Sequence, residues 1–150
     1  MSAEVEPAPA AAIVVAAGEG SRAGQAVPKQ FAPWRGKPVV RHSVEALSAA
    51  GLRPLVVVIP AGREAMAREA LAGILGLRFI SGGATRQESV RAGLEALAVE
   101  APLNVLIHDA ARPDLPRAII DRLLAALTVH PAAIPVLPVI DSLARADGEL

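Results

Sequence analysis

The stretch IVVAAGEGSRAG, residues 13–24, joins a short apolar run to a loop of small residues. Ile13 to Ala16 are apolar and partly β-branched, which is typical of a buried strand. Glycines at positions 18, 20 and 24 leave backbone N–H groups free to surround an anion. The stretch therefore predicts a buried strand that ends in an anion-binding loop.

Strand and helix patterns alternate along the rest of the chain. Further strands are predicted at 55–59, 77–80, 105–107 and 133–139, the last made irregular or an edge by Pro135 and Pro138. Helices are predicted at 38–50, 63–75, 85–98 and after Pro116. This alternation predicts an α/β domain with three layers, Rossmann-like, in which helices cover both faces of a mostly parallel sheet.

Three loops at strand ends are expected to meet on one side of that sheet. They span residues 17–28, 81–85 and 108–113. In parallel sheets ligands bind beyond the carboxyl ends of the strands. The sequence therefore predicts one binding site that the three loops share.

Composition limits the class of protein. We assign residues 1–11 to a disordered tail and 12–150 to a single domain. Fifteen Lys and Arg balance fifteen Asp and Glu, so the net charge gives no reason to expect nucleic acid or an acidic membrane as partner. The sequence has no cysteine, which excludes disulfides and thiolate chemistry and fits a cytoplasmic protein. No apolar run reaches the ~20 residues of a membrane-spanning helix.

The glycine loop differs from two well-known phosphate loops. The dinucleotide fingerprint GxGxxG needs its third glycine one residue earlier than Gly24, and an acidic residue after the second strand, which here ends in IPAG at 59–62. The Walker loop needs Lys after its last glycine, whereas Gln25 follows Gly24. The loop therefore fits neither pattern. Because the dinucleotide fingerprint is missing, a nicotinamide dehydrogenase is disfavoured.

Three motifs together resemble another group of enzymes. AAGEGSRAG at 16–24 with PKQF at 28–31 is similar to the signature loop of sugar-phosphate nucleotidyltransferases. GGATRQESV at 82–90 and HDAARP at 108–113 resemble, more narrowly, the 2-C-methyl-D-erythritol 4-phosphate cytidylyltransferase family. The resemblance implies a GT-A-type domain that joins CTP to a sugar phosphate, with Mg²⁺ as cofactor, in non-mevalonate isoprenoid biosynthesis.

The resemblance also implies roles for individual residues. Catalytic cations on the triphosphate would be Arg22 and Lys29. Nucleotide contacts would come from Ala16, Ala17, Gly18, Gly20, Gly82, Gly83 and Ser89. Asp109 would be the Mg²⁺ ligand, and Ser142, within VIDSLAR at 139–145, would contact the sugar phosphate.

Residue types alone leave structural alternatives open. Arg22 and Lys29 also fit a pair of solvated surface charges, and Asp109 also fits a brace for its own loop. The Ser142 segment also fits a simple turn. We interpret His108 as hydrogen-bonded scaffold and Arg86 as a support for its loop.

The acceptor and the activity also have alternatives. Ribitol-5-phosphate cytidylyltransferase shares both specific motifs, and a non-catalytic nucleotide-binding domain would keep Gly18 and Gly20. Chains of the family are longer, so we expect residues 12–150 to lack its C-terminal part, which carries the rest of an arm that reaches across a dimer. A homodimer is expected where that arm is complete.

Overall fold

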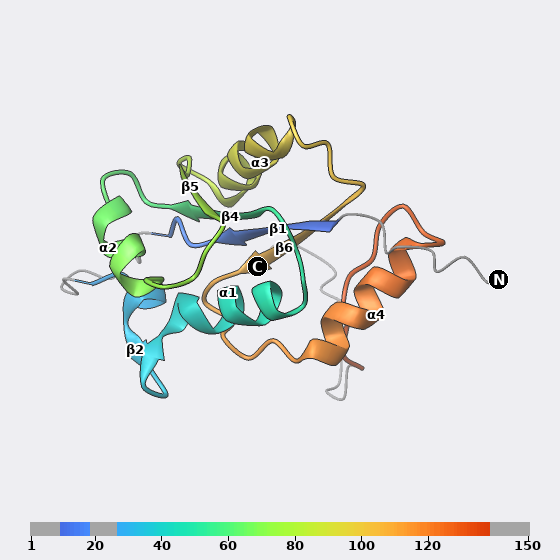
Figure 1. Ribbon diagram of the computed structural model, residues 1–150, viewed down its shortest axis with the longest axis horizontal. Coiled ribbons are helices and arrows are strands. Elements are labelled where there is room, and N and C mark those ends of the chain that lie inside the picture. Colours follow the sequence, from blue (N-terminus) through green and yellow to red (C-terminus); the bar gives the residue numbers. More distant parts are fainter. Residues whose placement is uncertain (1–9, 19–26, 139–150) are drawn as a thin grey trace, which may run out of the picture.

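A parallel sheet of four strands forms the centre of the domain (Figure 1). The computed structural model describes residues 10–18 and 27–138. The strands are β1 (Ala10–Val15), β4 (Leu55–Ile59), β5 (Leu77–Ser81) and β6 (Asn104–Asp109), in the order β5-β4-β1-β6. All three neighbouring pairs are parallel, so the carboxyl ends of all four strands lie at one edge of the sheet.

The first strand begins earlier than the sequence predicts. Ala10 and Ala11 pair with Asn104 and Val105 of β6. The Ala11 side chain is fully buried. These two residues therefore belong to the sheet, and the predicted boundary between a tail at 1–11 and a domain from residue 12 is wrong by two residues.

Helices cover both faces of the sheet, which confirms the predicted α/β class with three layers (Figure 1). One face packs against α1 (Val39–Ala49), α2 (Glu64–Ala70) and α4 (Arg117–Leu127). The other face packs against α3 (Arg86–Leu97). Successive strand residues point to opposite faces, so Val14 enters the first core and Ile13 the second.

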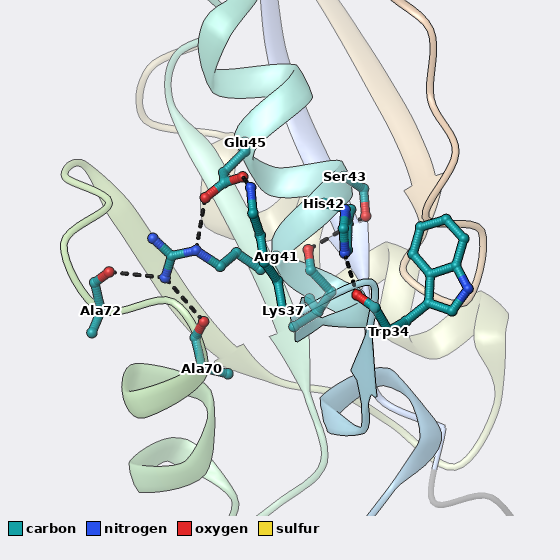
Figure 2. A network of polar contacts seen from close by, with 9 residues as sticks. Trp34, Lys37, Arg41, His42, Ser43, Glu45, Ala70 and Ala72 are labelled. Carbon is teal, nitrogen blue, oxygen red and sulfur yellow. Dashed lines mark hydrogen bonds and ion pairs between the residues drawn. The ribbon is translucent and has the colours of Figure 1, made fainter.

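A short hairpin links the end of β1 to α1. It follows the 3₁₀ turn η1 (Lys29–Phe31) and consists of β2 (Pro33–Trp34) and β3 (Lys37–Pro38). His42 of α1 holds the hairpin through a hydrogen bond of 2.8 Å between its Nε2 and the Trp34 carbonyl oxygen (Figure 2).

Two predicted elements differ from the structure. The predicted strand at 133–139 is wrong for residues 133–138, which form no strand, and Val139 lies outside the described residues. Pro135 and Pro138 have no N–H to give to a sheet, which explains the loss. The predicted helix at 63–75 is shorter, because α2 ends at Ala70 and Gly73 adopts a positive φ of 83°.

Within the described residues, no helix is long and apolar enough to cross a membrane.

Candidate functional site

A cavity of about 760 Å³ lies beyond the carboxyl ends of the strands. Its wall includes residues 15–18 at the end of β1, 82–86 after β5 and 109–112 at the end of β6. The predicted meeting of three loops is therefore confirmed for the part of the chain that the structure describes. Gly20, Arg22 and Ser142 lie outside the described residues, and their roles stay predictions.

Gln30 organises the loop that follows β1. Its buried Nε2 group donates hydrogen bonds to the carbonyl oxygens of Ala16, at 2.5 Å, and Gly18, at 2.8 Å. The Ala16 N–H donates to the Val58 carbonyl at 2.7 Å, whereas the Ala17 N–H has no acceptor within residues 10–18 and 27–138. Gln30 thus holds the two carbonyl oxygens on either side of Ala17, a residue of the cavity wall.

Lys29 precedes Gln30 in η1 and is exposed. It does not belong to the cavity wall formed by the described residues. The structure therefore anchors its backbone next to the cavity but does not bring its side chain into the cavity wall. The predicted role of Lys29 on a triphosphate remains a prediction.

The loop between β5 and α3 is packed closely against β1 and α3. A Cβ on Gly82 would lie 2.4 Å from the Ala17 Cβ and 2.7 Å from the Ser89 Oγ. A Cβ on Gly83 would lie 2.3 Å from the Glu88 Cβ. Contacts this short are not tolerated, so both glycines are required by packing inside the protein.

Ser89 has a clear structural task in this loop. Its buried hydroxyl donates to the Thr85 carbonyl at 3.0 Å and accepts from the Gly83 N–H at 3.2 Å. The predicted capping box is confirmed, because Thr85 Oγ1 accepts from the Glu88 N–H and Glu88 Oε2 accepts from the Thr85 N–H. Contacts of Gly82, Gly83 and Ser89 with the nucleotide remain predictions. The loop that would make these contacts is held by the hydrogen bonds of Ser89 and by close packing around both glycines.

Asp109 ends β6 and lies between two guanidinium groups. Arg86 Nε lies 2.9 Å from its Oδ1, and Arg112 Nε lies 3.9 Å from its Oδ2. The backbone is fixed here, since the Ala110 N–H donates to the Val15 carbonyl at 2.9 Å. The pair of Arg86 and Asp109 joins the loops after β5 and β6 across the cavity.

Sequence analysis missed this ion pair, although a signal was present. The capping box makes Arg86 the first residue of α3, and Asp109 is the last residue of β6. Both positions fall at the carboxyl edge of a parallel sheet. Opposite charges at two such positions would have suggested the contact.

His108 agrees with its interpretation as scaffold. Its Nε2 and the Arg112 carbonyl oxygen are 2.8 Å apart, which closes the turn after β6. Burial lowers the pKa of His108 below its usual 6.5, so the neutral ring is favoured. A neutral imidazole that holds a loop needs no further role in chemistry.

Asp109 fits a Mg²⁺ ion that takes most of its ligands from elsewhere. Within residues 10–18 and 27–138, no group of three or more His, Asp or Glu side chains is placed to hold a metal. Mg²⁺ commonly binds through one or two carboxylates together with water and substrate phosphates. Asp109 supplies one such carboxylate at the cavity wall.

The fold and the cavity together define the class of this protein. A parallel sheet whose strand-end loops enclose a cavity with a carboxylate and guanidinium groups in its wall is an α/β domain with its candidate site where such sheets bind ligands. The model of one family, 2-C-methyl-D-erythritol 4-phosphate cytidylyltransferase or IspD, matches residues 10–150. The chain belongs to this family.

Relatives of known name agree with the family. The bifunctional enzyme IspD/IspF of Novosphingobium aromaticivorans is 62% identical over 139 residues, which are 93% of this chain and 36% of the relative. The 2-C-methyl-D-erythritol 4-phosphate cytidylyltransferase of Cereibacter sphaeroides (strain ATCC 17029) is 47% identical over 141 residues, 92% of this chain and 62% of the relative. The chain thus spans between about a third and two thirds of the length of these relatives.

Solved structures support the same fold. A crystal structure of 4-diphosphocytidyl-2C-methyl-D-erythritol synthase has a TM-score of 0.76 at 28% identity, over 93% of this chain and 64% of that one. The bifunctional IspDF of Campylobacter jejuni has a TM-score of 0.65 at 26% identity, over 80% of this chain and 31% of that one. The Rossmann-like, GT-A-type prediction is therefore confirmed as to fold.

Proposed function

We propose that this domain transfers the cytidylyl group of CTP to 2-C-methyl-D-erythritol 4-phosphate. The products are CDP-methylerythritol and pyrophosphate. The observation that carries the proposal is that the three family motifs, so far as the structure describes them, each contribute residues to the wall of one cavity, in a chain that the family model matches over residues 10–150. The names of the relatives at 62% and 47% identity support the same reaction.

The chemistry requires positioning and charge neutralisation. A phosphate oxygen of the acceptor attacks the α-phosphorus of CTP, a new P–O bond forms, and the bond to the β-phosphate breaks. Pyrophosphate leaves with the electron pair of that bond. Phosphoryl transfer of this kind gains most from cations and N–H groups aimed at the developing charge.

The chain's own residues divide this work. Gln30 presents the Ala17 amide to the phosphates, and Lys29, with Arg22, neutralises the charge that the triphosphate gains. The closely packed Gly82 loop offers a flat surface to the base. Asp109 would hold Mg²⁺, which supplies further neutralisation of phosphate charge when it is bound.

The proposal is tested by pyrophosphate release. The chain is incubated with CTP and Mg²⁺ and with methylerythritol phosphate, ribitol 5-phosphate or no acceptor. We expect release with methylerythritol phosphate only, and a loss of about 10²–10³-fold in Lys29→Ala, the size seen when one charge-stabilising donor is removed. Lys37→Ala is the matched control, because Lys37 pairs with Glu45 away from the cavity.

The other outcomes each contradict part of the proposal. Turnover with ribitol 5-phosphate alone would assign another acceptor. Silence with both acceptors, together with measurable CTP binding, would leave a nucleotide-binding domain without transferase activity. Equal rates in Lys29→Ala and Lys37→Ala would remove Lys29 from the catalytic machinery.

Location and assembly belong to the same proposal. We place the reaction in the cytoplasm, where a chain without cysteine loses nothing to a reducing environment. We expect a homodimer where the family's arm is complete. Sedimentation of a chain that carries the complete arm, beside residues 1–150, measures the second point.

A further inference from the structure

The Asp109 carboxylate, which the proposed function assigns to Mg²⁺, already has a cation beside it. Arg86 reaches Oδ1 at 2.9 Å from the first turn of α3, and Arg112 stands 3.9 Å from Oδ2. The capping box and the Ser89 hydroxyl fix the start of α3, so the base of the Arg86 side chain is firmly placed. The guanidinium therefore occupies one of the two oxygens that a metal ion would use.

The Arg86 guanidinium can leave Asp109 at little cost in stability. Arg86 binds through Nε alone, and its two terminal nitrogens have no hydrogen-bond partner within residues 10–18 and 27–138. Its side chain is 61% exposed and lines the cavity. Exposed ion pairs contribute little to stability, so the fold does not depend on this contact.

The local charge opposes a free divalent cation. One carboxylate lies beside two guanidinium groups, so the cluster carries a net positive charge before any metal arrives. A nucleoside triphosphate changes this balance, because its negative charges attract both guanidinium groups and supply phosphate oxygens to the metal. The terminal nitrogens of Arg86 then have acceptors within the cavity.

We propose that Arg86 holds Asp109 as a stand-in cation and makes metal binding at Asp109 conditional on the triphosphate. The inference rests on the proposed function, since it takes Asp109 as the metal ligand. Arg86 is a positioning residue in this scheme: it leaves Oδ1 when its guanidinium turns to phosphate, and Oδ1 becomes available to the ion. A simple loop brace would show no such link to metal affinity.

The test measures binding of Mn²⁺, a paramagnetic substitute for Mg²⁺, to the chain without nucleotide. Free Mn²⁺ is followed by its electron paramagnetic resonance signal. We expect Arg86→Gln to bind Mn²⁺ about tenfold more tightly than the unchanged chain, because one positive charge within hydrogen-bond distance is removed from a solvated site. Arg91→Gln is the matched control, since Arg91 lies on the same helix but pairs with Glu95 outside the cavity.

Three further measurements keep the outcome decisive. Asp109→Asn added to Arg86→Gln should abolish the gained affinity, which assigns it to this carboxylate. Arg86→Lys should stay within about twofold of the unchanged chain, since the charge is kept. Thermal unfolding of each variant confirms that it is folded, and a variant that does not fold is replaced by Arg86→Met.

The result that overturns the inference is equal Mn²⁺ affinity in Arg86→Gln and the unchanged chain. This readout needs no acceptor and no turnover. If transferase activity is absent but Arg86→Gln gains a Mn²⁺ site at Asp109, the proposed reaction fails and the stand-in cation remains. If activity is present and the affinities are equal, only the inference fails.

Discussion

Two clusters in this molecule have the same pattern of charges and different surroundings. In each, one carboxylate lies between two cations. Glu45 lies 2.5 Å from Lys37 Nζ and 2.7 Å from Arg41 Nε (Figure 2). Asp109 lies 2.9 Å from Arg86 Nε and 3.9 Å from Arg112 Nε.

The difference lies in the remaining donors of the arginines. Arg41 Nη1 donates to the carbonyl oxygens of Ala70, at 3.2 Å, and Ala72, at 2.9 Å, and so ties α1 to the end of α2. Its side chain is only 24% exposed, against 61% for Arg86 and 78% for Arg112. A carboxylate between two cations thus braces the fold where backbone carbonyls complete the cluster, whereas the cluster at the cavity wall is far more exposed.

The largest expected effect is a difference in stability between Arg41→Gln and Arg86→Gln. Arg41→Gln removes charged hydrogen bonds to two carbonyls as well as an ion pair, and should lower the free energy of unfolding by about 1–3 kcal/mol. Arg86→Gln breaks one exposed pair and should change it by less than about 1 kcal/mol. Thermal unfolding measures both, with about 2–4 °C per kcal/mol expected for a domain of this size.

Equal losses in the two variants would break the comparison. They would mean that Arg86 stabilises the fold through contacts like those of Arg41. The Arg91→Gln variant gives the baseline, because its pair with Glu95 is highly exposed on one helix. A change in that variant should stay within about 0.5 kcal/mol.

The next largest effect concerns the cap that places Arg86. Thr85→Ala removes the side-chain oxygen that accepts from the Glu88 N–H at 3.1 Å. Loss of an N-cap hydroxyl should lower the free energy of unfolding by about 1 kcal/mol. Chemical denaturation measures this loss, with Thr128→Ala as control, because the Thr128 hydroxyl donates to the Ala125 carbonyl at a helix end that needs no such acceptor.

A stability loss in Thr128→Ala as large as that in Thr85→Ala would contradict the role of the cap. The Thr85→Ala variant also sharpens the comparison between the clusters. Its α3 should fray at the end that carries Arg86, so hydrogen exchange at the Glu88 N–H should quicken, whereas exchange around Arg41 should not change.

Sequence patterns predicted the parts of the fold that local chemistry decides. The apolar run 55–59 matches β4 residue for residue, and the Thr85–Glu88 capping box formed as predicted. The segment 133–138 was mistaken for a strand because it is apolar, yet its prolines cannot join a ladder. Ile134, Val136 and Leu137 are instead exposed in the described structure.

The sequence predicted which loops form the candidate site, but not the hydrogen bonds and ion pairs between their residues. Strand-end loops converge because parallel strands share one edge, which a sequence reveals. The hydrogen bonds of Gln30 to Ala16 and Gly18 depend on how η1 folds back, and no local pattern encodes that distance. The sequence predicts that Gly82 contacts the nucleotide. The structure shows another reason for a glycine here, because a side chain at position 82 would collide with Ala17 and Ser89.

The smallest expected effect is the pH dependence of stability that the Glu45 cluster contributes. Hydrogen bonding to Lys37, opposed by partial burial and supported by Arg41, holds the pKa of Glu45 below its usual 4.5. The unfolded chain therefore takes up a proton at higher pH than the folded chain does. The stabilisation is complete above about pH 4.5 and is lost as the pH falls further.

Glu45→Gln should therefore flatten the fall of the unfolding free energy on the acid side and leave stability at neutral pH lower by less than the capping effect, because the pair is partly exposed. Unfolding by urea from pH 3 to pH 7 measures the slope. Lys37→Gln should flatten it in part, since it removes the strongest of the causes that lower the pKa of Glu45. An acid slope unchanged in both variants would show that Glu45 titrates alike in the folded and unfolded chains, and the Glu45 cluster would then hold the fold chiefly through the hydrogen bonds of Arg41 to the carbonyls of Ala70 and Ala72.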